Sequence, residues 1–404
     1  MNEPGNGQRQ IESITTADGA CLTVKRRPRP GAPIIFLHGL GVNADLWDLP
    51  SVTGPDYEYH SLASILHAAG YDLWLLNFRG HGAPHMLSLP PPELNDWSVD
   101  HFIVFDLPAL VEHVLAATGQ RPFVVGASMG AMVLAGFAQG AQLVGCGAEA
   151  HIVANAELAA RRAEQLAGAV FVEFPAALCW PSSACDASGR VDWKALLRDF
   201  LRTDADANYP CELLARWAWL QTLIAEAGHV PLGWMRGEGR QSWWTRLPPA
   251  LADTLAEAQC KLVQGLLGVA GRFTGATNYR AEVLLQGRRY IVDHMKAGVL
   301  AQMAKSVRDK AFVSTLGSPD HVYSDHYANV SVPTLVVAGG RDRIANAAVT
   351  REVFFERIQS GDKTFRLYPE IAHGEFEAAP IATAQVYPEI KSWLDDRDRR
   401  THKA

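Results

Sequence analysis

The sequence is poor in cysteine, and no pattern organises the few cysteines that it has. Its 404 residues include six of them, with no two spaced as C-x-x-C: Cys21, Cys146, Cys179, Cys185, Cys211 and Cys260. This scatter indicates neither a metal site nor a disulfide framework. We expect buried or idle thiols, with Cys179 and Cys185 the pair near enough in the chain to bridge across a loop.

The sequence also lacks an excess of positive charge and long apolar runs. Lysine and arginine total 37 against 43 aspartates and glutamates, and the net charge is −6. Nothing here favours binding to nucleic acid or to an anionic membrane. No uninterrupted apolar run is long enough to cross a bilayer, so we expect no integral membrane segment. Residues 1–10 lack the apolar core of a signal peptide, so we expect a cytoplasmic location.

Composition and the order of local signals predict an α/β fold with an insertion. Hydrophobic residues make up 48% of the chain and charged residues 20%, as in an ordinary globular protein. Strand-like and helix-like segments alternate over residues 1–174 and 330–404, which predicts a mostly parallel sheet with helices on both faces. Residues 175–329 are instead helix-rich and hold seven of the eleven tryptophans. They predict a helical cap, inserted after the sixth core strand, whose aromatic residues form its core or line an apolar substrate cleft.

The stretch around Ser128 has the strongest functional signal. An apolar run at 122–125 leads into Gly126-Ala-Ser-Met-Gly130, and an apolar helix-like segment follows at once. A G-x-S-x-G sequence between a strand and a helix is typical of a sharp turn that exposes a nucleophilic serine. The two glycines remove Cβ atoms where strand and helix would collide, and Ser128 is expected in a strained conformation. The alternative is a glycine-rich turn with an incidental serine.

A second glycine-rich loop follows the apolar strand predicted at 33–37. It reads His38-Gly-Leu-Gly41, and its glycines allow the backbone to aim an amide at a bound group. In acyl transfer, one oxyanion donor comes from such a loop and the other from the residue after the nucleophile. We therefore assign the oxyanion hole to the amides of Leu40 and Met129. An ordinary strand-to-helix turn is the alternative.

Two later loops supply the candidate acid and the candidate base. Asp342 ends the loop after a strand predicted at 332–338, and His373 lies in the loop after a last strand at 365–368. Loops that follow parallel strands gather at one edge of a sheet, so Ser128, Asp342 and His373 are expected to converge there. Glu173, at the end of a strand predicted at 167–174, is an alternative acid.

Smaller signals predict local structure. Ala17-Asp-Gly19 predicts a β-hairpin turn, and Ser98 is the expected N-cap of a helix over 99–117 that Pro108 kinks or divides. The alanine-rich segment 149–166 is predicted to be helical, and residues 395–404 to fray as a charged tail. Arg79 and His81, in the loop after a strand at 71–77, are interpreted as residues that brace that loop.

These motifs together resemble the α/β-hydrolase superfamily, in which serine, acid and histidine follow one another in this chain order. The resemblance covers the N-terminal half and the last eighty or so residues but not the cap, and it rests on His38-Gly-Leu-Gly41, Gly126-Ala-Ser-Met-Gly130, Pro333-Thr-Leu-Val-Val-Ala-Gly-Gly-Arg-Asp342 and His373-Gly374. Segments 73–80 and 105–109 are similar to the acid-lipase and esterase-lipase branch. That branch implies hydrolysis of carboxylic esters with apolar acyl or alcohol groups.

The implied chemistry is a Ser-His-Asp triad acting through an acyl-enzyme intermediate. His373 accepts the proton of Ser128, Asp342 orients the imidazole, and no metal or organic cofactor is required. An acyltransferase, a thioesterase, a lyase or a C–C bond hydrolase would use the same triad, and a non-catalytic ligand receptor could share the fold. The expected partner is a small apolar ester, and the sequence does not indicate an oligomeric state.

Overall fold

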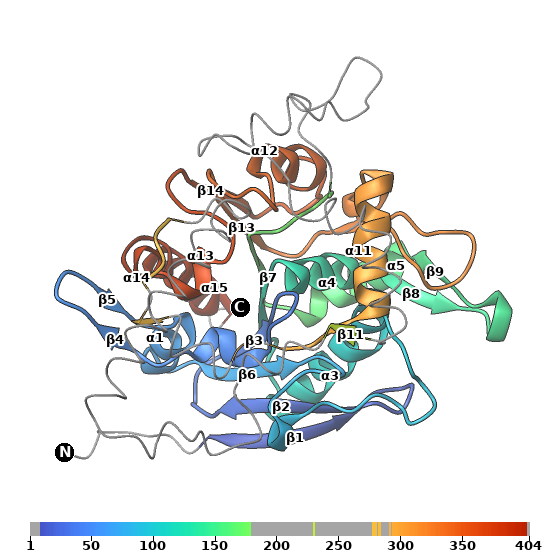
Figure 1. Ribbon diagram of the computed structural model, residues 1–404, viewed down its shortest axis with the longest axis horizontal. Helices are drawn as coiled ribbons and strands as arrows, with labels where there is room; N and C mark the ends of the chain where they lie inside the picture. Colours follow the sequence, from blue (N-terminus) through green and yellow to red (C-terminus); the bar gives the residue numbers. More distant parts are fainter. Residues whose placement is uncertain are drawn as a thin grey trace.

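The computed structural model describes residues 9–178 and 293–401, with four short stretches between them at 229–230, 277–280, 282–283 and 291. Its centre is an eight-stranded sheet (Figure 1). Six strands run parallel, and an antiparallel pair forms one edge. In spatial order they are β1 (Gln10–Thr15), β2 (Cys21–Arg27), β6 (Asp72–Asn77), β3 (Pro33–Leu37), β7 (Phe123–Ala127), β10 (Gly168–Val172), β13 (Thr334–Gly339) and β14 (Lys363–Tyr368).

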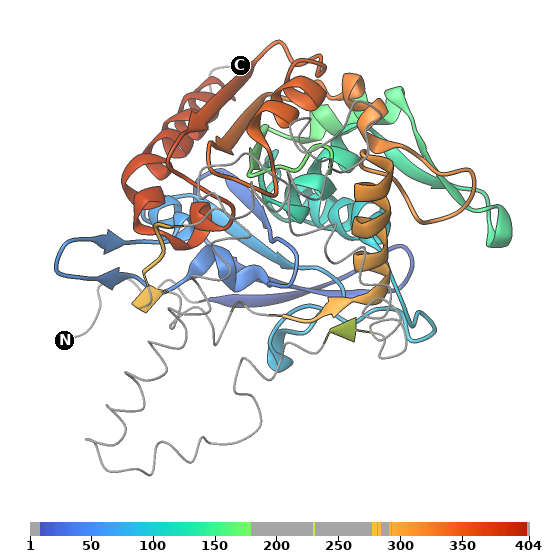
Figure 2. The same cartoon turned by 45° about the horizontal axis from the view of Figure 1, so that its top comes forward.

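Helices cover both faces of this sheet (Figures 1 and 2). Because side chains alternate along a strand, Ile35 and Leu37 of β3 enter one hydrophobic cluster while Ile34 and Phe36 enter another. The predicted mostly parallel sheet with helices on both faces is therefore confirmed. The first cluster includes α3 (Leu107–Thr118), α4 (Met129–Ala138) and α11 (Ala297–Asp309), and the second includes α1 (Leu62–Ala68), α14 (Pro380–Gln385) and α15 (Tyr387–Thr401).

The remaining described elements are short. They include the small strand pairs β4 with β5, β8 with β9, and β11 with β12. Their bounds are β4 (Val52–Thr53), β5 (Glu58–Tyr59), β8 (Ala141–Val144), β9 (His151–Ala154), β11 (His229–Val230), β12 (Met295–Lys296), α2 (Val99–His101), α5 (Ala156–Gln165), α12 (Ala347–Thr350) and α13 (Glu375–Ala378).

The helix predicted over 99–117 forms and is divided, as Pro108 requires. It runs as α2, a π-helical turn at Phe102–Asp106, and α3, with Pro108 in the first turn of α3. Proline has no amide hydrogen, so the regular ladder is broken just before it and the widened turn accommodates the break. By length and hydropathy, Val99–Thr118 is the helix in the described part of the chain that could span a bilayer. Its buried side chains instead pack against the sheet in the first cluster.

Two local predictions are wrong, the first of them in part. Residues 150–155 are not helical: β9 pairs with β8 as a hairpin, because β-branched residues at 152 and 153 follow a turn with left-handed glycines at 145 and 147. The charged tail is helical as far as Thr401, and in the same helix Lys391 pairs with Asp395 one turn further along. Cys21 and Cys146 are free and exposed, in keeping with idle thiols; Cys21 begins β2 and Cys146 lies in that hairpin turn.

Most of the predicted cap lies outside the described residues, including its seven tryptophans and the other four cysteines. The cap and its boundaries at 175 and 329 stay predictions. The described part of this range, from residue 293 onwards, includes α11, whose Val299 and Met303 pack in the first cluster. Asp100 of α2 ties the segment after α11 to the core by accepting hydrogen bonds from the amide of Thr315 (2.8 Å) and the hydroxyl of Tyr323 (2.7 Å).

Arg79 braces the loop after β6 to two other parts of the core, as the sequence predicted. The side chain is fully buried. Its Nε donates to Asp106 Oδ1 at 2.8 Å, and its Nη1 donates to Asp18 Oδ2 at 2.5 Å. Asp106 precedes α3, and Asp18 lies in the predicted hairpin turn between β1 and β2, where Gly19 has a φ of +89°. One guanidinium thus fixes the positions of three chain segments.

Replacing Arg79 is expected to destabilise the protein strongly. Arg79→Met leaves two carboxylates in the core without their cation, and breaking a buried ion pair costs about 3–5 kcal/mol. Chemical denaturation measures the free energy of unfolding. Arg351→Met is the matched control, because Arg351 is 60% exposed and makes a 3.5 Å surface pair worth less than about 1 kcal/mol. Equal losses in the two variants would contradict the bracing role.

Candidate active site

Ser128 lies in a strained turn between β7 and α4. Its backbone φ of 50° and ψ of −115° are values that residues other than glycine rarely adopt. A Cβ at Gly126 would lie 2.6 Å from the carbonyl oxygen of Gly130, and a Cβ at Gly130 would lie 2.5 Å from that of Leu37. Strand and helix therefore approach so closely that only glycine fits at both positions, as the sequence predicted.

The structure brings the three sequence-predicted side chains together at the carboxyl edge of the sheet. Ser128 follows β7, Asp342 follows β13, and His373 follows β14. His373 Nε2 lies 3.0 Å from Ser128 Oγ, and its Nδ1 lies 2.9 Å from Asp342 Oδ2. Because a carboxylate can only accept, Nδ1 carries the hydrogen and Nε2 of the neutral ring is free to accept the hydroxyl proton.

The acid in contact with Nδ1 of His373 is Asp342, whereas Glu173 approaches Nε2. Asp342 Oδ1 accepts from the amides of Ile344 (2.8 Å) and Ala345 (2.7 Å), which fixes the carboxylate. Glu173 Oε1 is 3.6 Å from His373 Nε2, and its Oε2 accepts from the Gly374 amide at 2.5 Å. Glu173 therefore supports the loop that carries the histidine and does not occupy the position of Asp342.

Two backbone amides are available where the sequence placed an oxyanion hole. Met129 begins α4, and Leu40 lies in the loop after β3. Among the described residues, neither amide donates a hydrogen bond to a backbone carbonyl. His38 holds the Leu40 loop: its Nδ1 donates to the Gly39 carbonyl at 2.9 Å, and its Nε2 accepts from the Phe78 amide at 3.3 Å. Burial lowers the pKa of His38 well below its usual range, which keeps this ring neutral.

Comparison with family models agrees with this architecture. Residues 32–142 match a model described as alpha/beta hydrolase fold, and residues 301–377 match one described as Serine aminopeptidase, S33. The first range holds Ser128, Leu40 and Met129, and the second holds Asp342 and His373. The chain has the α/β-hydrolase fold.

The curated relatives that this chain matches are lipases by name. Triacylglycerol lipase 1 of Arabidopsis thaliana is 31% identical over 32% of this chain and 34% of its own length. Tear acid lipase-like protein of Mesocricetus auratus is 34% identical over 34% and 36%, and human Lipase member K is 36% identical over 30% and 32%. The chain thus spans about a third of the length of the curated relatives it matches. A solved thermophilic esterase from Thermogutta terrifontis covers 96% of this chain and 99% of its own at 16% identity, with a TM-score of 0.48, too low to carry an argument.

Buried carboxyl groups crowd His373. Burial disfavours the charged ring of His373, but the charge and hydrogen bond of Asp342, with the charge of Glu377, outweigh it and raise its pKa above 6.5. Burial raises the pKa of Glu377 to about 7. Burial and the charges of Glu377 and Asp342 raise the pKa of Glu173 well above its usual range, which favours its neutral form. The imidazole thus lies among acids of which two are pushed towards the uncharged form.

The same acids give the cluster that could hold a cation. Glu173, Asp342 and His373 each offer a ligand atom, all within 4.8 Å of one another. However, both ring nitrogens of His373 already face hydrogen-bond partners, and a neutral Glu173 is a poor ligand. The residues present suit proton transfer better than metal binding.

Two acidic residues next to His373 were missed by the sequence analysis. Glu375 accepts from the amides of Ala372 (2.9 Å) and Thr277 (2.6 Å), and so joins the histidine loop to residues that the sequence assigned to the cap. Glu377 is 2% exposed, and its two oxygens have no hydrogen-bond partner among the described residues. The acidic pair in His373-Gly-Glu-Phe-Glu377, beside an otherwise apolar segment, is the signal that could have identified them.

Removing Glu377 is expected to lower the pKa of His373. The charge of Glu377 helps to hold the proton on the imidazole, so Glu377→Gln should move the midpoint of the histidine titration towards lower pH. NMR titration of labelled imidazoles measures it, with the His373 signal assigned by its absence in His373→Gln. The exposed Glu370→Gln is the control and should leave the midpoint unchanged. A midpoint in Glu377→Gln equal to that of the wild type would contradict the electrostatic role.

Proposed function

We propose that this protein is a serine hydrolase that cleaves carboxylic esters carrying apolar acyl or alcohol groups. The observation that carries the proposal is the position of one imidazole, 3.0 Å from the Ser128 hydroxyl and 2.9 Å from the Asp342 carboxylate. The relatives support the substrate class, since their names describe lipases, including triacylglycerol lipase.

Acylation begins when Ser128 Oγ attacks the ester carbonyl. A serine hydroxyl is a weak nucleophile at neutral pH, so His373 Nε2 takes its proton as the new C–O bond forms. The ring becomes positively charged, and the adjacent Asp342 stabilises that charge and keeps Nδ1 in the donating tautomer. The tetrahedral intermediate collapses when His373 returns the proton to the leaving alcohol, which leaves the acyl group on Ser128.

The negative charge that develops on the carbonyl oxygen is stabilised by hydrogen-bond donors whose positions are fixed before the reaction. The amides of Leu40 and Met129 serve this purpose in the proposed mechanism, and each contributes about 3 kcal/mol to the stabilisation of the transition state. The Met129 amide opens α4, where the helix dipole adds to its effect. Water then attacks the acyl-enzyme with His373 again as the base, and the acid product is released.

Loss of either reacting side chain should abolish turnover. Ser128→Ala or His373→Ala is expected to reduce kcat on a p-nitrophenyl ester by about 10⁶-fold, because the residues act as a unit. Burst release of p-nitrophenol and labelling by a fluorophosphonate report the serine directly. Wild-type turnover in His373→Ala would end the proposal. Transfer of the acyl group to an added alcohol in preference to water would instead assign an acyltransferase.

Substitution of each candidate acid in turn should show whether Asp342 or Glu173 is the acid of the triad. Asp342→Asn presents an amide to Nδ1, favours the wrong tautomer, and is expected to lower kcat by about 10⁴-fold. Glu173→Gln keeps a neutral group at the Nε2 side of the ring and should lower kcat by less than about tenfold. The steady-state pH profile of each variant measures the effect. The reverse ranking would make Glu173 the triad acid.

A further inference from the structure

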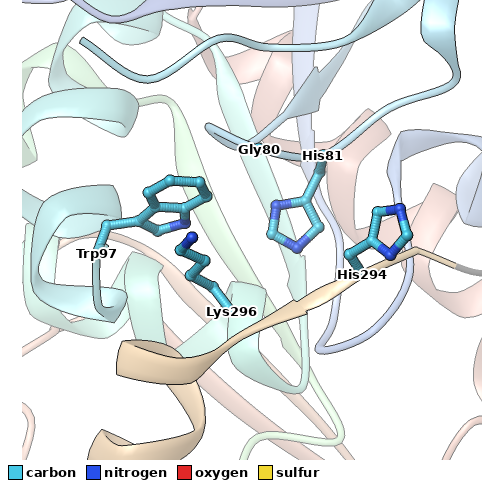
Figure 3. Close-up of a pocket in the computed structure, with 5 residues that line it drawn as sticks. All are labelled: Gly80, His81, Trp97, His294 and Lys296. Atoms are coloured by element: carbon cyan, nitrogen blue, oxygen red, sulfur yellow. The ribbon is translucent and has the colours of Figure 1, made fainter. Parts of the chain in front are cut away.

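A small cavity at the loop after β6 has no part in the mechanism above. Its volume is about 190 Å³, and it is lined by Gly80, His81, Trp97, His294 and Lys296 (Figure 3). An apolar cavity of about 150 Å³ accommodates a benzene molecule, whereas pockets for whole ligands occupy about 300 Å³ or more. The space therefore suits one functional group of a ligand.

The lining is rich in hydrogen-bond donors. Lys296 Nζ lies 4.7 Å from the centre of the Trp97 ring, and among the described residues it makes no ion pair. Trp97 is only 9% exposed, and its indole Nε1–H donates to no described residue. Figure 3 shows the ammonium beside the indole nitrogen, with the His81 ring beyond them. An indole N–H without a described partner and a lysine ammonium lie side by side. Together they favour a ligand group that is negatively charged and accepts hydrogen bonds.

The acidic residues near this cavity are engaged by backbone amides. Asp293 Oδ2 accepts from the Gly82 amide at 2.7 Å, and its Oδ1 accepts from the His294 amide at 2.7 Å. Asp96 Oδ1 accepts from the amides of Trp97 (2.9 Å) and Gly298 (3.0 Å). Neither carboxylate is among the described residues that line the cavity, so the described lining leaves room for an acceptor that a ligand brings.

The cavity and Ser128 share one edge of the sheet. His81 lies in the loop after β6, and β6 is separated from β7 by β3 alone. Neighbouring strands are about 4.8 Å apart, so the ends of β6 and β7 are roughly 10 Å apart along that edge. The chain that carries Lys296 also touches the proposed oxyanion loop, because the Asp293 amide donates to the Gly41 carbonyl at 2.8 Å. A ligand of moderate length could fill both sites.

We propose that this cavity binds a carboxylate or phosphate group through Lys296 and the indole N–H of Trp97. The group belongs to the substrate, at the end of the ester distant from the scissile bond; this assignment of its source rests on the proposed function. The enzyme would then prefer esters with one anionic end and an apolar connection to the reacting carbonyl.

Calorimetric titration of the full-length protein with acetate and with inorganic phosphate tests the binding itself and needs no turnover. Lys296→Met and Trp97→Phe each remove one donor and keep most of the side-chain volume, and each should weaken binding by about tenfold or more. Lys391→Met removes a lysine far along the chain on α15 and should bind as the wild type does. Circular dichroism verifies that the variants are folded.

Matched substrates test where the anion comes from. The mono-p-nitrophenyl ester of suberic acid carries a free carboxylate, and its methyl-capped analogue is neutral and of similar length. The wild type is expected to favour the anionic ester by about tenfold in kcat/KM, through KM; Lys296→Met should lose this preference, whereas Lys391→Met should keep it.

Each outcome decides a different point. Anion binding in the wild type that is equally strong in Lys296→Met and Trp97→Phe, or no binding at all, overturns the proposal. Lysine-dependent binding without a preference for the anionic ester assigns the site to a free anion. If neither ester is cleaved while the titration behaves as expected, the proposed function fails and the anion site remains.

Discussion

The close approach of β7 and α4 at Ser128 is the constraint on which the site depends. The chain reverses so sharply that Cβ atoms at 126 and 130 would overlap backbone oxygens, and Ser128 is held in a left-handed conformation. This geometry places the hydroxyl at the start of a helix, and among the described residues the Met129 amide donates to no backbone carbonyl. The strain is offset by the surrounding core, since β7 is buried along its whole length between β3 and β10.

The carboxyl groups around His373 are the second constraint on the site, through their charges. One imidazole lies among Asp342, Glu173 and Glu377, in a setting where all of these carboxyls cannot be charged together. The acid that contacts Nδ1 is fixed by two backbone amides, whereas burial favours the neutral form of the other two. The most firmly held negative charge therefore lies at Nδ1, on the side of the ring away from Ser128, where the proposed mechanism needs it.

The loops that carry these groups are held by polar side chains inside the core. His38 connects the Leu40 loop to the loop after β6, Arg79 connects that loop to α3 and to the β1–β2 turn, and Glu375 connects the histidine loop to residues 277–278. A shift in any of these connections would move an oxyanion donor or the base relative to Ser128. The cavity at Trp97 and Lys296 is formed from the same β6 loop, so its position relative to Ser128 is fixed by the same contacts.

The sequence alone determined the strand pattern, the serine turn and the chain order of the three reactive residues. These features follow from local rules: alternation of apolar side chains, glycine where no Cβ fits, and loops that succeed parallel strands. It did not determine whether Asp342 or Glu173 faces Nδ1, because both follow core strands and the choice depends on how three distant loops meet. The β8–β9 hairpin, the burial of Glu377 and the cavity under Trp97 were likewise decided by tertiary packing, since each depends on contacts between segments far apart in the chain.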